Sequence, residues 1–440
     1  MFFVRHGCDV QALHKRVVCK LSTPRAFRSR SQRALILFDS SNSFANRKLQ
    51  ESLSFALTTV VSDGFPFVLS KMWPRKSESP TEESHTLETT RVNGITMRYA
   101  TCGARDAPLV LLLHGWPESW FSWRHQLRAL ANAGYHAVAP DMRGYGGTDA
   151  PQSHASYTVA TLAGDVIGLM HALGYACAFL VGHDWGAWLT WQLALLHPTL
   201  FPAIAVLSVP YAGRGRAGLL TLLKQKYGDP EDLAPGVRRR AAYHYQLHNA
   251  LPQAAEGYDA NVRETLYRLY GFLPGCASDP PEETREVMFP DGDDQVVGFW
   301  RRLPRPKELP GWLSEADLEY FVREFERTGF HASLNWYRTG NLNWELTPHL
   351  ETARVQQPTL FLAGGLDMVI RAHGGAARVQ EQLATWCAQP PRCVMYAEAG
   401  HWIQQERSEE VSAEIVQFLA AQPERAQEAA RPAWHPRARL

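Results

Sequence analysis

The sequence predicts an α/β protein in which a mostly parallel sheet carries helices on both faces. Leu109–Leu113 is a continuous apolar run, the pattern of a strand buried on both sides in a parallel sheet. Beyond this run, further short apolar segments alternate with helical stretches, as they do in α/β folds. Hydrophobic residues make up 45% of the 440 positions, so the chain can also bury a substantial core.

The elements follow one another in a clear order. Val92-Asn93-Gly94-Ile95 is typical of a hairpin turn between two short strands. The polar stretch before it, residues 74–91, is rich in Pro, Ser and Glu and indicates a linker, so we expect the folded part to begin near Arg91. After Leu113, the expected strands are Tyr135–Pro140, Ala178–Gly182, Ala203–Ser208, Thr359–Ala363 and Cys393–Ala397, and the expected helices lie near 122–132, 158–173, 186–196 and 409–421.

The alternation of expected strands and helices stops for about 150 residues, between Val206 and Pro358. Nine of the fifteen tyrosines lie between positions 211 and 345. We interpret this segment as a helical cap inserted into the sheet domain, with most of its rings serving as packing. The predicted domains are therefore a core of residues 91–210 and 350–422, a cap of residues 211–349, an N-terminal extension of residues 1–90 and a C-terminal tail of residues 423–440.

The formal net charge of +1 disfavours a nucleic-acid-binding protein, which would need clustered basic residues. The charge is unevenly distributed, because residues 1–50 hold ten Lys and Arg but only two acids. This Ser-rich basic arm is typical of an organelle transit peptide, although a plain disordered extension has the same composition. The apolar stretch Leu53–Val61 is too short to span a membrane. The seven scattered cysteines indicate reduced thiols rather than a disulfide scaffold or a zinc module, and no cofactor is expected.

The strongest chemical motif is Val181-Gly182-His183-Asp184-Trp185-Gly186, which joins an expected strand to an expected helix. This is the setting of a nucleophile elbow, in which small flanking residues let a tight turn present one side chain. Here that side chain is Asp184. A carboxylate that attacks a saturated carbon forms an ester whose carbonyl belongs to the enzyme, so water must then attack the aspartate itself. Such chemistry suits epoxides and alkyl halides; the alternative is that Asp184 only caps the helix.

Two further segments complete the expected site. His114-Gly115-Trp116-Pro117 follows the buried strand, and the backbone N–H groups of Trp116 and Trp185 are expected to form the oxyanion hole. We also expect a cis bond before Pro117. Asp367 and His401 follow the last two strands, which gives the chain order nucleophile, acid, base. Asp367 would orient the imidazole of His401, which would activate the water.

At these motifs the sequence resembles the soluble epoxide hydrolases of the α/β-hydrolase superfamily. The resemblance spans roughly residues 90–420 and includes the segments H-G-W-P-E-S-W (114–120), D-M-R-G-Y-G-G-T-D (141–149), G-H-D-W-G (182–186), L-N-W-Y-R (334–338) and A-G-H-W (399–402). It implies an eight-stranded α/β-hydrolase sheet and two cap tyrosines that donate to the epoxide oxygen. Tyr337 matches the first closely, whereas Tyr245 matches the second more loosely and Tyr243 competes with it. Asp141, Arg143 and Asp149 are expected to form a structural, ion-paired turn.

The sequence therefore predicts an epoxide hydrolase that converts hydrophobic epoxides and water to vicinal diols through an ester on Asp184. One alternative is a hydrolytic dehalogenase, and another is a ligand-binding α/β-hydrolase that has lost catalysis. We expect a monomer or homodimer without an integral membrane span. The expected location is intracellular, in an organelle or, from the terminal Ala438-Arg439-Leu440, in the peroxisome, with the cytoplasm as the fallback.

Overall fold

The computed structural model describes residues 85–232, 244–272, 303 and 305–422, together with two short strands nearer the N-terminus. The chain divides into two compact units, Met1–Thr81 and Glu82–Leu440. In the first unit, β1 (Val17–Cys19) pairs with β2 (Ala34–Ile36) in antiparallel register. The remainder of the basic arm and the C-terminal tripeptide lie outside the described residues, and so do both predicted targeting signals.

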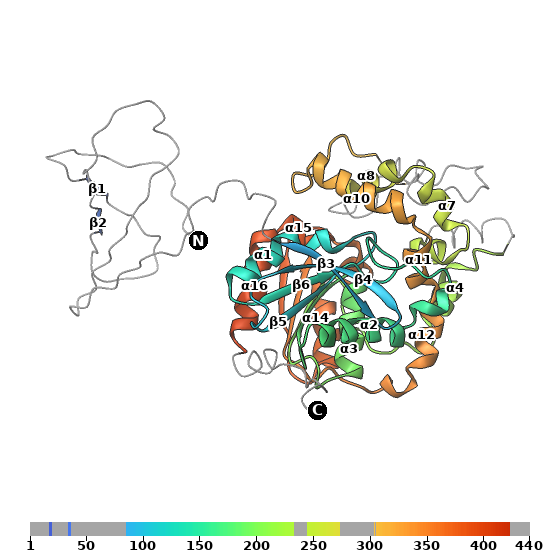
Figure 1. The fold of residues 1–440 in the computed structure, drawn as a ribbon, viewed down its shortest axis with the longest axis horizontal. Helices are drawn as coiled ribbons and strands as arrows, with labels where there is room; N and C mark the ends of the chain where they lie inside the picture. Colours follow the sequence, from blue (N-terminus) through green and yellow to red (C-terminus); the bar gives the residue numbers. More distant parts are fainter. Residues whose placement is uncertain are drawn as a thin grey trace, which may run out of the picture. The chain divides into compact units, whose positions relative to one another are not determined.

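Eight strands of the second unit form one sheet in the order β10-β9-β8-β7-β5-β6-β4-β3 (Figure 1). Neighbouring strands from β10 to β6 are parallel, and β4 runs antiparallel to both β3 and β6. The predicted, mostly parallel eight-stranded sheet is thereby confirmed. The strands are β3 (Thr86–Val92), β4 (Ile95–Cys102), β5 (Leu109–Leu113), β6 (His136–Pro140), β7 (Phe179–His183), β8 (Ile204–Leu207), β9 (Thr359–Gly364) and β10 (Arg392–Tyr396).

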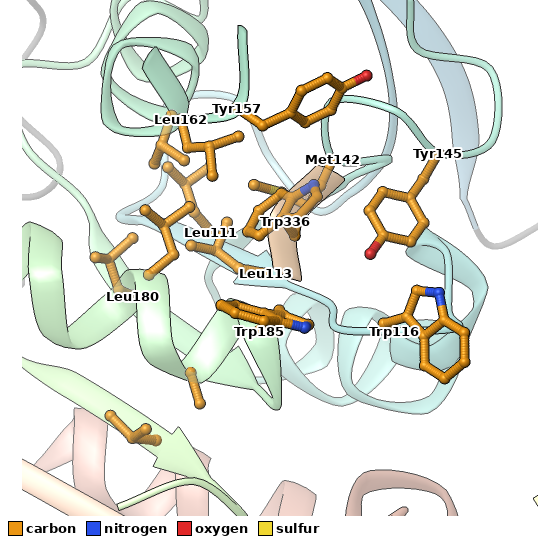
Figure 2. Packing of buried hydrophobic residues seen from close by; sticks show 14 of the residues in the cluster. Leu111, Leu113, Trp116, Met142, Tyr145, Tyr157, Leu162, Leu180, Trp185 and Trp336 are labelled. Carbon is orange, nitrogen blue, oxygen red and sulfur yellow. The ribbon is translucent and has the colours of Figure 1, made fainter. Parts of the chain in front are cut away.

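Strand β5 shows why the sheet needs helices on both faces. Leu109, Leu111 and Leu113 belong to one hydrophobic cluster, whereas Val110 and Leu112 belong to another. Side chains alternate between faces along a strand, so an uninterrupted apolar strand must be covered twice. The first cluster includes residues of α2 (Val159–Ala172) and α3 (Trp185–Leu196), and Figure 2 shows part of it. The second includes residues of α1 (Arg124–Asn132) and α16 (Ser408–Ala420).

The predicted start of the folded part was wrong by several residues. The hairpin turn lies where expected, between Val92 and Ile95, but β3 already begins at Thr86. All seven residues of β3 pair with β4. Because β3 is the edge strand of the sheet, most of its side chains meet solvent, and its polar composition resembles that of a linker.

Between β8 and β9 the described residues form mainly helices, and we call this segment the insertion (residues 208–358). The α-helices among its described residues are α4 (Leu219–Tyr227), α6 (Tyr245–Ala250), α7 (Ala254–Asp259), α8 (Val262–Phe272), α10 (Glu315–Thr328), α11 (His331–Arg338) and α12 (Gly340–Leu346). Three further helices follow β9, and they were not among the expected ones: α13 (Met368–Ala372), α14 (Ala376–Trp386) and α15 (Ile403–Glu406). In the described parts of the chain, no helix combines the length and apolar character needed to cross a membrane.

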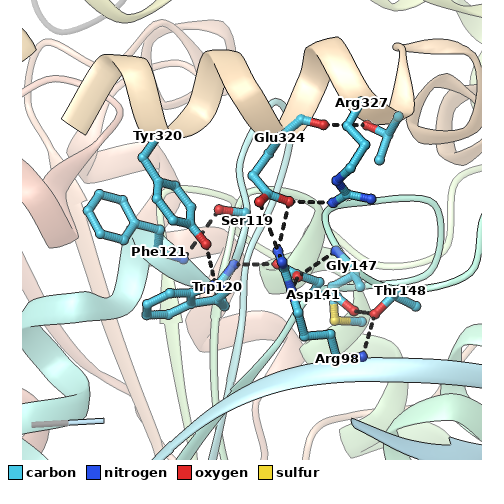
Figure 3. Close-up of polar contacts among 12 residues, drawn as sticks. Arg98, Ser119, Trp120, Phe121, Asp141, Gly147, Thr148, Tyr320, Glu324 and Arg327 are labelled. Atoms are coloured by element: carbon cyan, nitrogen blue, oxygen red, sulfur yellow. Dashed lines mark hydrogen bonds and ion pairs between the residues drawn. The ribbon is translucent and has the colours of Figure 1, made fainter. Parts of the chain in front are cut away.

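A buried polar cluster ties the insertion to the sheet (Figure 3). Arg98 on β4 donates through Nε to Asp141, and its Nη2 lies 2.7 Å from Glu324 on helix α10. Asp141 is fully buried and also accepts hydrogen bonds from the backbone N–H groups of Trp120 and Gly147. Arg98 therefore neutralises a buried carboxylate and links two segments far apart in the sequence.

The expected ion-paired turn within residues 141–149 is wrong in its pairing. Arg143 pairs with Asp165 of α2, at 2.6 Å, rather than with either acid of the turn. Asp149 instead accepts from the backbone N–H of Thr96, at 2.8 Å. Asp141 and Arg143 are buried, and each pairs with a charged side chain on another element, because a buried charge is costly without a partner.

Candidate active site

Asp184 is the single residue between the end of β7 and the start of α3. Its φ of +52° lies in the left-handed region, which non-glycine residues rarely adopt. The turn is tight because glycines flank it. A Cβ on Gly182 would lie 2.3 Å from the carbonyl oxygen of Gly186, and one on Gly186 would lie 2.0 Å from that of Leu113. The predicted strand–turn–helix elbow is present, and it presents the carboxylate of Asp184 at the end of the sheet.

The loop after β5 approaches this carboxylate from the neighbouring strand. A Cβ on Gly115 would lie 2.4 Å from both Cβ and Oδ1 of Asp184, so only glycine allows this approach. The backbone N–H of Trp116 donates to Asp184 Oδ1 at 2.8 Å, and the Trp116–Pro117 bond is cis, as expected. The N–H of Trp185 makes no hydrogen bond to this carboxylate among the described residues. The role of this N–H in the oxyanion hole stays a prediction. An oxyanion hole points at the oxygen that becomes negatively charged in the tetrahedral intermediate, rather than at the carboxylate oxygen of the free enzyme.

The predicted acid and histidine meet Asp184 at the same edge of the sheet. His401 Nε2 lies 3.6 Å from Asp184 Oδ2, and His401 Nδ1 lies 3.0 Å from Asp367 Oδ2. The other oxygen of Asp367 accepts from the backbone N–H of Val369 at 2.8 Å. Asp367 follows β9 and His401 follows β10, and these two strands are parallel neighbours. The three side chains converge because the carboxyl ends of parallel strands share one edge.

Buried charges perturb the protonation of this group. Burial by itself raises the pKa of Asp184, but the adjacent His401 and the N–H of Trp116 outweigh it and leave the pKa below its ordinary value. Burial lowers the pKa of His401, whereas the carboxylates of Asp367 and Asp184 raise it, with a net pKa well above the ordinary value. The resting site therefore pairs a carboxylate with a histidine flanked by two acids.

A second buried group supports the site, and the sequence analysis missed it. Glu118 Oε2 accepts from the backbone N–H of Gly115 at 2.7 Å and lies 2.9 Å from His183 Nδ1. His183 Nε2 lies 2.8 Å from the carbonyl oxygen of His401, and Gln404 donates to Glu118 Oε1. Burial raises the pKa of Glu118, but the neighbouring His183 and Gly115 N–H lower it overall. This network links the loop of Gly115 to the backbone of His401. The sequence offered one indication of it, namely that Glu118 and His183 both lie inside recognised motifs.

The two predicted tyrosines lie close to the elbow. Tyr337 on α11 is 3% exposed, and its ring centroid lies 4.9 Å from that of Trp185 and 5.7 Å from that of Trp116. Tyr245, at the start of α6, has its ring centroid 6.2 Å from that of Tyr337. Burial and the charge of Asp184 raise the pKa of both tyrosines, so both keep their proton at neutral pH. The competing Tyr243 lies outside the described residues.

A cavity of about 480 Å³ opens beside Asp184, within the usual size of small-molecule sites. Asp184, Trp185 and Tyr245 form part of its wall, and Tyr337 contacts the rings of the latter two. Tyr337 and His401 are not themselves among the described residues of the wall. The described residues contain no group of three or more His, Cys, Asp or Glu placed to hold a metal ion.

Comparisons with known proteins identify the fold and the family of this chain. Residues 108–263 match the family model described as alpha/beta hydrolase fold. Epoxide hydrolase A of Mycobacterium tuberculosis is 37% identical over 330 residues, which cover 74% of this chain and 95% of that protein. Epoxide hydrolase 3 of Siraitia grosvenorii is 36% identical over 339 residues, which cover 75% and 97%. The crystal structure of Epoxide Hydrolase A from Mycobacterium thermoresistibile has a TM-score of 0.68 at 38% identity and covers 76% of this chain and 98% of its own. Since the likeness extends over nearly the whole of each relative, this chain belongs to the epoxide hydrolase family of the α/β-hydrolase fold.

Proposed function

We propose that this protein hydrolyses hydrophobic epoxides to vicinal diols through an alkyl ester on Asp184. The observation that carries the proposal is the convergence of an aspartate elbow with a His401–Asp367 pair beside a largely apolar cavity. A serine at the elbow would serve acyl transfer. An aspartate instead supplies a nucleophile whose ester the enzyme must itself hydrolyse.

In the first step, a carboxylate oxygen of Asp184 attacks an epoxide carbon, and the carbon–oxygen bond of the ring breaks. Oδ1 is held by the N–H of Trp116, which supports Oδ2 as the attacking atom. The departing oxygen stays on the substrate as a basic alkoxide and takes a proton from a tyrosine. Tyr245 and Tyr337 are proposed as these donors, because both remain protonated until an acceptor forms.

In the second step, His401 removes a proton from water, and the resulting hydroxide attacks the carboxyl carbon of the ester. Asp367 holds the imidazole through Nδ1, so that Nε2 faces Asp184. The negative charge on the former Oδ1 is stabilised by the N–H of Trp116 and, we propose, that of Trp185. Collapse of the tetrahedral intermediate breaks the bond between the carboxyl carbon and the ester oxygen. The leaving alkoxide takes the proton of the new hydroxyl group, which releases the diol and restores the carboxylate of Asp184. The tyrosinate left by the first step regains its proton from His401.

A single turnover in heavy-oxygen water tests the ester directly. With enzyme in excess over an aryl epoxide, the oxygen added to the first diol comes from Asp184, so that diol should carry no label. The heavy oxygen should appear in the peptide containing Asp184, as measured by mass spectrometry. Label in the diol of the first turnover would mean direct attack by water and would contradict the proposed mechanism.

The same preparation separates the two alternative functions. A hydrolytic dehalogenase would release bromide from an alkyl bromide faster than it opens an epoxide. A halide leaves without a proton, so the two tyrosine hydroxyls near Asp184 favour the epoxide. A ligand-binding protein that has lost catalysis would bind epoxides without producing diol, but all three members of the expected triad are in contact.

We expect Tyr337→Phe to slow epoxide opening by about 10²-fold or more, because the alkoxide loses a positioned acid. The measurement is the rate at which Asp184 is alkylated in a single turnover, monitored by mass spectrometry of the enzyme. Tyr211→Phe is the matched control, since Tyr211 also lines the cavity but packs against Trp191 and Trp386 and should leave this rate near that of the wild type. Equal rates in Tyr337→Phe and the control would remove Tyr337 from the chemistry.

Several finer assignments are also part of the proposal. We assign residues 211–349 as a cap over the active site and the remaining described part of Glu82–Leu440 as the core. A monomer or homodimer is proposed as the working form. The basic arm and the terminal Ala438-Arg439-Leu440 are proposed as competing organelle and peroxisome signals, which separate tags on each end would distinguish.

A further inference from the structure

The cavity beside Asp184 has a charged residue that the proposed reaction does not use. Most of the wall consists of apolar or aromatic side chains, including Trp188, Leu219 and Leu222. Arg214 is the only Lys or Arg among the described residues that line it. His373 also lines it, but burial lowers its pKa, so this histidine is neutral at neutral pH. The described wall of the cavity thus holds an anion, Asp184, and one permanent cation, Arg214.

Within the part of the chain that the structure describes, the charge of Arg214 has no counter-ion. No carboxylate among the described residues forms an ion pair with it. Its guanidinium carbon lies 4.0 Å from the ring centroid of Trp344, and Nη2 donates to the carbonyl oxygen of Trp344 at 2.8 Å. Nε is buried and has no acceptor among the described residues. An arginine has five N–H donors, and within the described residues only Nη2 of this stacked guanidinium donates to an acceptor.

We propose that Arg214 forms an anion subsite that selects epoxides carrying a carboxylate at the end remote from the ring; this inference rests on the proposed epoxide hydrolase function. A guanidinium fits a carboxylate closely and binds it with charge-assisted hydrogen bonds. The apolar wall suits a hydrocarbon chain between the two ends.

The two charges of the cavity also fix the direction of binding. A ligand carboxylate next to Asp184 would face a second buried negative charge, which is unfavourable in a site of low dielectric. A ligand carboxylate at Arg214 is attracted instead, and this leaves the epoxide free to lie at Asp184. The subsite would therefore determine which end of an amphiphilic epoxide reaches the nucleophile, and it would act on KM rather than on the chemistry.

The test compares the cis-epoxide of oleic acid with its methyl ester, both below the concentration at which they form micelles. The two probes share the hydrocarbon chain and the epoxide and differ only in the charge at the end. In the wild type we expect kcat/KM for the acid to exceed that for the ester by about 10- to 100-fold, the usual range for a hydrogen bond to a charged group. Arg214→Met should bring this ratio close to one, chiefly by raising KM for the acid, with a much smaller change for the ester.

Two further variants separate charge from shape. Arg214→Lys keeps the positive charge and should retain part of the preference for the acid. Arg216→Met is the matched control, because Arg216 is an exposed arginine two positions away and outside the wall, and it should leave the preference intact. Equal kcat/KM for acid and ester in the wild type would overturn the subsite, as would an equal loss for both probes in Arg214→Met. Failure of the wild type to open either probe would instead count against the proposed function itself.

Discussion

We expect Asp184→Ala to lower diol formation by at least about 10⁴-fold, because no other group can form the ester. Asp184 is the acidic residue at the elbow, with Oδ1 bound by the N–H of Trp116 and Oδ2 facing His401. Alanine removes both carboxylate oxygens, so no nucleophile attacks the epoxide and no ester forms for water to attack. The measurement is steady-state diol production from an aryl epoxide, with mass spectrometry for the absence of alkylated enzyme.

The control for this variant is Glu398→Ala. Glu398 also carries a carboxylate and lies close to His401 in the sequence, but its side chain is 91% exposed. It should keep the rate of the wild type. Circular dichroism should show that Asp184→Ala is folded, since the glycines that permit the turn are retained. Diol formation by folded Asp184→Ala at more than a trace of the wild-type rate would exclude the ester mechanism.

His401→Gln should separate the two steps of the reaction. Asp184 can still attack, but the water that must open the ester has no base, so we expect diol release to fall by about 10⁴-fold. Each enzyme molecule should consume one epoxide and gain the mass of the substrate on the peptide that contains Asp184. His154→Gln is the control, because His154 is exposed and distant in the sequence, and it should turn over normally without accumulating ester. Loss of turnover in folded His401→Gln without such an adduct would contradict the assigned role.

The pH dependence of the second step follows from the same charges. In the resting enzyme, the carboxylates of Asp367 and Asp184 raise the pKa of His401. Formation of the ester removes the charge of Asp184, so the pKa of His401 must fall in the intermediate, and the neutral base becomes available. Ester hydrolysis should slow as the pH falls through this lower pKa, and the fraction of esterified enzyme at steady state should rise. A rate of ester hydrolysis that is flat between about pH 5 and 8 would argue against a histidine base.

Much of this site was visible in the sequence because its signals are local. A buried strand, a glycine-flanked turn and a helical stretch lie within a few residues of one another around Asp184, and the same holds for the loop at Trp116. Asp184, Asp367 and His401 each follow an expected strand. Their order along the chain predicted that they meet, because the carboxyl ends of parallel strands share one edge of the sheet. The strand that begins at Thr86 was predicted to be part of a linker because its residues are polar. A strand covered on one side only can have the composition of a linker.

Contacts between side chains far apart in the sequence could not be predicted from local patterns. Glu118 and His183 lie 65 residues apart, and Arg98 and Glu324 lie 226 apart. Arg143 was expected to pair within its own turn and instead binds Asp165. A charged side chain takes the partner that burial brings to it, and nothing in the local pattern states which partner that is.

The sequence by itself therefore determined the sheet and the meeting of Asp184, Asp367 and His401 at its edge, since periodicity, turn chemistry and strand order are properties of the chain. The tertiary structure decided which buried network holds the loop of Gly115 against His401, and that the cavity runs from Asp184 to Arg214. The cavity depends on how the insertion packs on the sheet edge, whereas the network joins loops that follow separate strands. A cavity wall and a buried ion pair exist only where separate elements enclose the same space.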